Sequence, residues 1–190
     1  MRSRHLLSVL LFALSACAAS ALPQTTIEDI TLNDTTMTFH LRNRDERFSV
    51  TLPQGWEKQD VETGDEMMTW NAPRSAFGIA VYVPTMTDGK GPPDDPAWEK
   101  GALAAIRGPL EQKSPAEYTW KGSRELELFG RPALETTVQQ KDGTFVRDTY
   151  FFRNGFLFTA SFVTEENGLE TVWPSVEEAL EAMTFDDVTK

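Results

Sequence analysis

Histidine and cysteine, the side chains that most often carry acid–base and nucleophilic chemistry, are scarce in this sequence. The 190 residues include two histidines and one cysteine. His5 lies in a segment with the features of an export signal, so His40 and Cys17 are the candidates that remain. His40 alternates with Phe39 and Leu41, which predicts that it points away from the apolar side of a strand. No G-x-S-x-G or H-E-x-x-H motif accompanies it, so we interpret His40 as a surface residue rather than a general base.

Carboxylates are abundant, and three of them lie close together in the sequence. Asp88, Asp94 and Asp95 flank a Gly/Pro-rich segment and offer the oxygen ligands that calcium prefers, but their spacing is not that of an EF-hand loop. Asp95 followed by Pro96 instead predicts a helix N-terminus. The Gly89-Lys90-Gly91 segment lacks the spacing of a phosphate-binding loop. We therefore expect no metal site and no bound cofactor.

The N-terminal segment predicts export. Met1–His5 is basic and the apolar run Leu6–Leu14 is too short to span a bilayer, which needs roughly 20 residues. The run ends in Leu14-Ser15-Ala16-Cys17, which resembles the lipobox of bacterial lipoproteins. That resemblance implies cleavage after residue 16, acylation of Cys17 and a membrane anchor made of several acyl chains. The residue after the cysteine is Ala18 rather than Asp, which in that family resembles the outer-membrane default.

A rival interpretation of the N-terminus is ordinary cleavage. Ala19-Ser20-Ala21 has the A-x-A pattern, and cutting before Leu22 releases a protein with no anchor. We favour lipidation because Cys17 lies where the apolar run ends. The predicted organisation is a signal peptide over 1–16, a lipidated tether over 17–25 and a single domain over 26–190.

The charge balance excludes two classes of partner. With 18 Lys and Arg against 29 Asp and Glu, the net charge is −11. So acidic a chain is not expected to bind nucleic acid through its phosphates or to dock on anionic lipid by charge. A single cysteine allows no internal disulfide.

Hydrophobic periodicity predicts strands followed by a helix, more strands and a closing helix. Strands are predicted around 38–42, 48–52, 66–70 and 77–83, and a helix follows Asp95 and ends at Gly108-Pro109. A last helix is predicted after Pro174, with Ser175 and Glu178 as a capping box.

The clearest local pattern is a three-stranded meander over 134–140, 145–152 and 156–163. Asp142-Gly143 and Asn154-Gly155 each predict a two-residue turn, and counting from these turns assigns the side chains to two faces. The predicted core face carries Leu134, Val138, Phe145, Phe151, Phe156, Phe158, Ala160 and Phe162. The other face is predicted to be mixed and partly covered, with Glu135, Thr137, Gln139, Asp148, Thr159 and Ser161 among Val146, Tyr150, Phe152, Leu157 and Val163.

Several landmarks together resemble a known fold. They are FSVTLPQGW at 48–56, FGIAVYV at 77–83, RELELFGRPALETTV at 124–138 and VEEALEAMTF at 176–185. In this order they resemble the fold shared by PsbP and the Mog-type Ran-binding protein, with bacterial envelope relatives of the DcrB kind, over about 45–186. The resemblance implies an α+β fold, an α/β/α sandwich with a central antiparallel sheet. It implies binding more than catalysis, and it carries no site residues over.

Five tryptophans are the remaining candidates for a contact surface, although large aromatic residues also dominate small cores. We interpret Trp56, Trp70, Trp98, Trp120 and Trp173 mainly as core or core-edge residues. The hypothesis for function is a lipid-anchored protein on the periplasmic side of the bacterial envelope that binds, or helps to assemble, another envelope protein. The alternatives are a periplasmic enzyme that uses carboxylates and His40, or a small-molecule carrier with a closed apolar cavity between sheet and helix.

Overall fold

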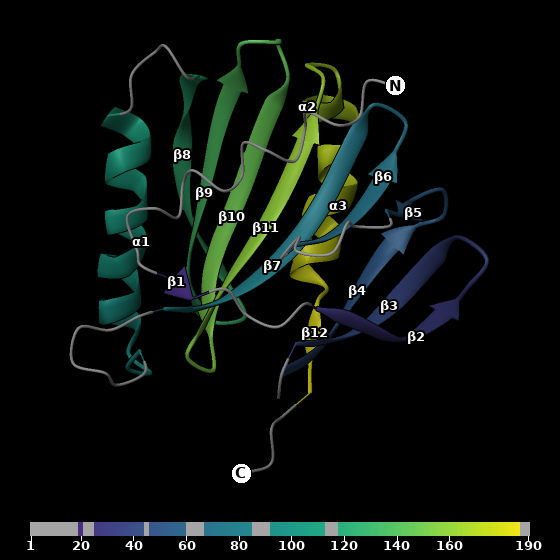
Figure 1. The fold of residues 1–190 in the computed structure, drawn as a ribbon, viewed down its shortest axis with the longest axis horizontal. Coiled ribbons are helices and arrows are strands. Elements are labelled where there is room, and N and C mark those ends of the chain that lie inside the picture. The colour runs from purple at the N-terminus through teal and green to yellow at the C-terminus, as the bar shows by residue number, and fades with distance from the viewer. Residues whose placement is uncertain are drawn as a thin grey trace.

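The strands of this protein form two antiparallel sheets that pack against each other (Figure 1). The computed structural model describes residues 19–20, 25–43, 46–59, 67–84, 92–112 and 118–186. In these segments the helices are α1 (Pro96–Gln112), α2 (Gly168–Thr171) and α3 (Trp173–Glu181). None of the described helices is both long enough and apolar enough to cross a membrane.

The larger sheet has eight strands in its described part, in the order β5-β6-β7-β11-β10-β9-β8, with β1 paired to β7. Its strands are β1 (Ala19–Ser20), β5 (Glu57–Lys58), β6 (Met68–Ala72), β7 (Ser75–Pro84), β8 (Tyr118–Leu128), β9 (Arg131–Gln140), β10 (Phe145–Arg153) and β11 (Phe156–Thr164).

The smaller sheet has four strands in the order β12-β4-β3-β2. They are β2 (Thr26–Leu32), β3 (Thr36–Asn43), β4 (Glu46–Pro53) and β12 (Thr184–Phe185). Phe39 and Leu41 on β3, and Phe48 and Val50 on β4, are buried, as their alternation predicts.

Two apolar clusters lie on opposite faces of the larger sheet. One face meets the smaller sheet and α3, where Phe158, Phe48 and Val176 belong to a single buried cluster. The other face meets α1, whose Leu103 and Ile106 pack with residues that include Tyr150 and Val146. Figure 1 shows α1 beside β8 at one end of the larger sheet, and the smaller sheet at the other end.

The expected α/β/α sandwich with a single central sheet is therefore wrong. The chain is mostly β-sheet, and the finding that overturns the expectation is the second antiparallel sheet. The physical reason lies in β3 and β4, which pair with each other from Thr36↔Pro53 to Asn43↔Glu46. The paired strands have an apolar face of their own, so they form a second layer. This layer covers a face of the larger sheet that the predicted sandwich would cover with a helix.

The hairpin between β10 and β11 has the predicted turn and register. Asn154 and Gly155 have φ values of 51° and 80°, as a type I′ turn requires, and Arg153 pairs with Phe156. Phe151, Phe158 and Phe162 accordingly share the buried face that meets the smaller sheet. Thr159, placed by sequence on a partly covered face, is also buried.

The hairpin between β9 and β10 does not have the predicted two-residue turn. Gln140 pairs with Thr144 around a three-residue loop, in which the Gly143 N–H donates to the Gln140 carbonyl at 3.0 Å. The extra residue shifts β9 by one position relative to β10, and Val138 pairs with Val146. Because a shift of one residue exchanges the two faces, Leu134 and Val138 face α1, whereas Glu135 and Thr137 face the smaller sheet and α3.

Both helix boundaries taken from capping signals also differ from the prediction. Helix α1 continues through Pro109 to Gln112, because Leu110 is buried and its carbonyl accepts a hydrogen bond from the Tyr118 hydroxyl at 2.8 Å. The Ser175–Glu178 capping box does not form. The chain is already helical at Val172, and the Ser175 hydroxyl donates to the Val172 carbonyl instead.

The central face of β10 and β11 allows a stability test with a matched control. Phe158 is 0% exposed, and Phe158→Ala is expected to lower the free energy of unfolding by about 3–5 kcal/mol because it leaves a cavity. Thr149 on the same face is 1% exposed and its hydroxyl has no hydrogen-bond partner, so the isosteric Thr149→Val is expected to cost less than about 1 kcal/mol. Urea unfolding of both variants checks this, and equal losses would contradict the cavity as the cause of the Phe158→Ala loss.

Candidate functional site

The described candidates for chemistry do not gather at one place. His40 lies on the outer face of the smaller sheet, opposite in direction to Phe39, as predicted. Its Nε2 lies 3.1 Å from the Thr31 hydroxyl and its Nδ1 lies 2.8 Å from the Ser49 hydroxyl. A Ser-His-Asp triad needs a carboxylate at one ring nitrogen, and here both nitrogens face hydroxyls. The arrangement links β2, β3 and β4 side by side.

The aspartates of the calcium hypothesis have other partners. The Asp95 carboxylate accepts a hydrogen bond from the Ala97 N–H at 3.0 Å and caps α1, as predicted. Asp94 lies 2.6 Å from the Arg131 guanidinium, which also donates to Glu99 at 3.0 Å. Asp88 lies outside the described residues. Within the described ranges, no group of three His, Cys, Asp or Glu side chains is placed to hold a metal ion.

Cys17, the predicted lipidation site, also lies outside the described residues. Two residues further on, β1 pairs with the end of β7 through Ala19↔Pro84 and Ser20↔Val83.

The tryptophans are core and core-edge residues, as predicted. Trp56, Trp70 and Trp173 are buried between the two sheets and α3, and Trp98 and Trp120 are partly buried against the α1 cluster. Trp70 stacks on Phe77 with ring centroids 5.8 Å apart. These rings stabilise the packing of the layers and are not an exposed contact surface.

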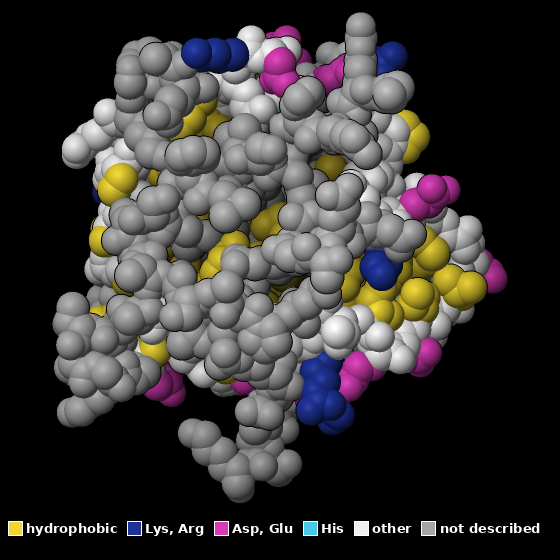
Figure 2. Space-filling model, in the orientation of Figure 1, with side chains coloured by type: hydrophobic (Ala, Val, Ile, Leu, Met, Phe, Trp, Pro, Cys, Tyr) yellow, Lys and Arg dark blue, Asp and Glu magenta, His cyan; other side chains and the backbone are white. Residues whose placement is uncertain are grey.

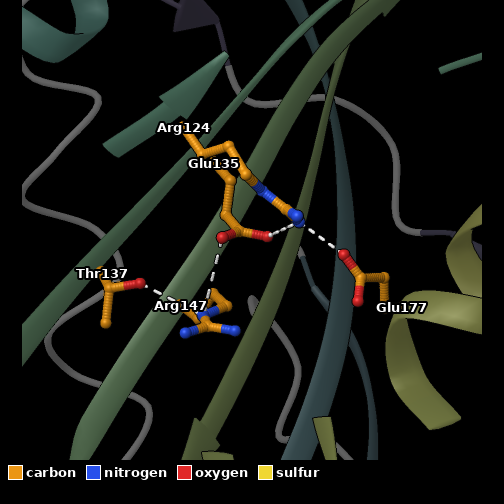
Figure 3. A network of polar contacts seen from close by, with 5 residues as sticks. All are labelled: Arg124, Glu135, Thr137, Arg147 and Glu177. Carbon is orange, nitrogen blue, oxygen red and sulfur yellow. Dashed lines mark hydrogen bonds and ion pairs between the residues drawn. The ribbon is translucent and has the colours of Figure 1, made fainter. Parts of the chain in front are cut away.

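A network of charged side chains connects α3 to the larger sheet (Figure 3). Arg124 on β8 lies 2.9 Å from Glu135 on β9 and also pairs with Glu177 on α3. Arg147 on β10 donates to the Thr137 hydroxyl at 3.1 Å, and its Nε lies 3.8 Å from Glu135. The Glu135 side chain is only 9% exposed, so the two arginines compensate a carboxylate that is largely removed from water.

This network is best explained as a structural clamp. Its two arginines face two glutamates, so it carries no excess charge to attract a ligand. The Arg147 guanidinium also lies over the Trp173 ring, 4.8 Å from the ring centroid, where it makes a cation–π contact. Together these contacts fix α3 against β8, β9 and β10.

A groove of about 320 Å³ lies between α1 and the β8–β9 hairpin. Lys100 and Arg107 of α1 reach across it to Glu125 of β8 at 3.0 and 3.5 Å. The hydrogen bond from Lys100 lowers the pKa of the Glu125 carboxyl. The groove is open and crossed by charged side chains, whereas a carrier of apolar molecules needs a closed cavity. His40 is not among its lining residues, so the grouping that the enzyme hypothesis requires is not found there.

A carboxyl on the strands of the larger sheet is buried on the side that α1 covers. Asp148 on β10 accepts hydrogen bonds from the Ser161 hydroxyl on β11 and, at 3.1 Å, from the Tyr150 hydroxyl. Burial raises the pKa of Asp148 to about 6, although both hydrogen bonds favour the charged form. Burial also raises the pKa of Tyr150, and the neighbouring Asp148 charge raises it further.

The feature that sequence reasoning missed is strand β2 at the edge of the smaller sheet. Ile30 is 45% exposed and Leu32 is 66% exposed. They are the most exposed large apolar side chains among the described residues. Figure 2 shows apolar side chains gathered over the β2–β3 end of the smaller sheet, with acidic side chains at the margin. The alternation that could have identified β2 is interrupted by a bulge between Ile27 and Asp29.

The buried carboxyl leads to a prediction about pH. In the unfolded chain Asp148 has the ordinary pKa near 4. Its raised pKa in the folded state means that this group stabilises the fold below pH 4 and that the contribution is lost as pH rises through 6. The difference of about two pH units corresponds to roughly 3 kcal/mol. The free energy of unfolding of Asp148→Asn, measured by urea unfolding, should therefore rise relative to that of wild type by about this amount as the pH is raised from 4 to 7. A pH-independent difference between the two proteins would contradict the buried-carboxyl assignment.

Comparisons with known proteins show the fold and not the function. No protein-family model matches the sequence, and a search of curated proteins finds no match. Among solved structures the chain is similar to cyanobacterial PsbP (CyanoP) from Synechocystis sp. PCC 6803, with a TM-score of 0.54 and 13% identity over 82% of this chain and 95% of that chain. The predicted resemblance to PsbP is thus confirmed at the level of the fold.

Two further likenesses have lower scores. LpqN, described as involved in cell envelope biogenesis of Mycobacterium tuberculosis, matches 85% of this chain and 90% of its own, with 12% identity and a TM-score of 0.46. A protein from Bacteroides thetaiotaomicron VPI-5482 matches 75% of this chain and 46% of its own, with 14% identity and a TM-score of 0.49. Such scores do not establish a shared fold with either protein.

Proposed function

We propose that this protein is a lipid-anchored module of the bacterial cell envelope that binds another envelope protein on the periplasmic side of the membrane and carries out no catalysis. The observation that carries the binding role is the exposed apolar pair on the edge strand β2. Exposed apolar side chains on a sheet edge favour contact with another chain.

The location rests on the N-terminal sequence. Cys17 follows a basic start and a short apolar run, the pattern of a lipoprotein signal, and Ala18 after it favours the outer membrane. Eight residues separate Cys17 from Thr26, the first residue of β2, and two of them, Ala19 and Ser20, pair with β7 as β1. Eight residues extend at most about 30 Å, so an anchor at Cys17 holds β2 near the membrane surface. Confinement to that surface raises the effective concentration of a partner in the same membrane.

The enzyme alternative finds less support than the binding role. It requires His40 and carboxylates around a substrate pocket, whereas His40 bonds to Thr31 and Ser49 on the outer face of the smaller sheet. The proposal includes neither a metal nor a cofactor.

The lipid anchor is tested by labelling. Cells that express the wild-type chain should incorporate labelled palmitate into the protein and retain it in the membrane fraction, because the Cys17 thiol is the acceptor. Cys17→Ser should abolish incorporation and release most of the protein from the membrane. A mature chain that begins at Leu22, determined by mass spectrometry, would establish ordinary cleavage instead.

The binding role is tested by photocrosslinking in cells. A photoreactive residue is placed in turn at Leu32 on β2, Lys100 at the α1 groove and Glu165 after β11, and captured material is identified by mass spectrometry. At least one site should capture one envelope protein reproducibly, and the destabilising Phe158→Ala should reduce that capture because the surface needs the folded core. Capture of lipid alone, or of no protein above background, would refute the binding role. A turnover that His40→Ala removes without unfolding the protein would favour the enzyme.

A further inference from the structure

Strand β2 is the least protected of the four sheet edges in the described part of the chain. The larger sheet ends in β5, which is two residues long and charged, and in β8, which carries Lys121, Arg124, Glu125 and Glu127. The smaller sheet ends in the two-residue β12 and in β2. Natural proteins block sheet edges by short strands, lysine, proline or bulges. Strand β2 has seven residues and neither lysine nor proline.

The bulge in β2 protects only its first half. The register shifts between Ile27 and Asp29, which leaves Glu28 as the extra residue. From Asp29 to Leu32 the pairing with β3 is regular, from Asp29↔His40 to Leu32↔Met37. This second half is a straight edge on which a further strand can pair.

The exposed apolar pair lies on the core side of the smaller sheet. Ile30 pairs with Phe39, which is 2% exposed and part of the core, and Leu32 pairs with the partly buried Met37. The apolar layer is therefore well covered at β3 but only partly covered at β2. Side chains of a strand added beside β2 would lie about 5 Å from Ile30 and Leu32 and extend this layer.

The charged side chains along β2 favour a partner strand with basic side chains. Glu28 is paired with Arg42 at 3.5 Å and with Arg47 at 3.0 Å. Asp29, paired with His40 in the register, lies on the outer face, and the exposed Asp34 follows the strand. An incoming strand with basic side chains on its outer face would compensate these two carboxylates.

A second copy of this chain fits the edge poorly. Antiparallel pairing of two β2 strands with Ile30 opposite Leu32 would place Asp34 of each copy opposite Glu28 of the other, and each chain carries a net charge of −11. The same acidic residues would repel an anionic membrane surface.

We propose that β2 is a docking edge that binds an extended segment of a partner protein as a fifth strand, a segment whose apolar side chains face Ile30 and Leu32 and whose alternating basic side chains face Asp29. This inference deepens the proposed function by naming the site and the partner chemistry of the binding module. Main-chain hydrogen bonds would supply affinity, and the alternation of apolar and basic side chains would supply specificity.

The test uses the mature chain in detergent and a synthetic probe, the blocked heptapeptide Val-Lys-Val-Lys-Val-Lys-Val, with Val-Glu-Val-Glu-Val-Glu-Val for comparison. Backbone hydrogen exchange is measured for residues 29–32 and for the other edge strand β8. The lysine peptide should slow exchange in 29–32 by at least tenfold and leave β8 unchanged, because strand addition protects edge amides. The glutamate peptide should give no protection.

Variants separate the apolar and the charged contributions. Leu32→Ser should abolish most of the protection, Asp29→Asn should weaken it several-fold, and Thr35→Ser, in the adjacent turn, should leave it as in wild type. Melting curves check that all three variants fold. The proposal is overturned by protection that survives in Leu32→Ser, by protection that depends on protein concentration without peptide, which indicates a second copy, or by protection from vesicles alone.

Failure of this inference is distinguishable from failure of the proposed function. A partner captured in cells from Lys100 or Glu165, but not from Leu32, together with no protection by the lysine peptide, would leave the binding role intact and refute β2 as its site. Capture from Leu32 supports the inference only when the crosslinked partner peptide has the alternating apolar and basic pattern.

Discussion

Both faces of the larger sheet are apolar at its centre, and every other layer of the molecule is arranged to cover them. Along β10 and β11 the residues facing one way are dominated by phenylalanine, and those facing the other way include Val146, Tyr150 and Leu157. A sheet of this kind is stable only when two layers keep water from it. The smaller sheet and α3 cover one face, and α1 covers part of the other. The N-terminal strands β3 and β4 and the C-terminal helix α3 meet on the same face of the larger sheet.

Polar groups occur at the borders of these layers and inside one of them. Arg124, Glu135, Arg147 and Glu177 pair where α3 meets the sheet, so charges brought out of water are compensated there. Asp148 is different, because it is buried with hydroxyl partners only. Its carboxyl costs stability at neutral pH that hydroxyl donors recover only in part. Ion pairs thus hold α3, whereas the Asp148 carboxyl is buried beneath the other layer with hydroxyl partners.

The apolar layer of the smaller sheet is covered unevenly. Phe39 and Leu41 of β3 are fully covered, while β2 extends past the region where the larger sheet and α3 provide cover. The same apolar layer that stabilises the domain is therefore accessible at its last strand. The docking edge proposed at β2 needs no pocket, because that edge is a continuation of the core.

From the sequence alone we predicted strands that correspond to β3, β4, β6, β7, β9, β10 and β11, but not β2 or β8. We also predicted the Asn154-Gly155 turn and the face shared by Phe151, Phe158 and Phe162, because alternation and positive-φ turns act within a few residues. The sequence also determined the N-cap at Asp95, the core role of the tryptophans and the resemblance to PsbP in fold. Local signals were insufficient where two possible structures differed by one residue in a loop, or where a contact between residues far apart in the sequence decided between them. Asp142-Gly143 is compatible with loops of two or three residues, and only pairing across the whole hairpin selected the longer one, which moved Leu134 and Glu135 to opposite faces. The end of α1 was decided by Leu110 and Tyr118, and the second sheet by pairing between β3 and β4. The exposure of Ile30 and Leu32 also depends on the tertiary structure, because an apolar side chain on a strand stays exposed only where no other layer covers it.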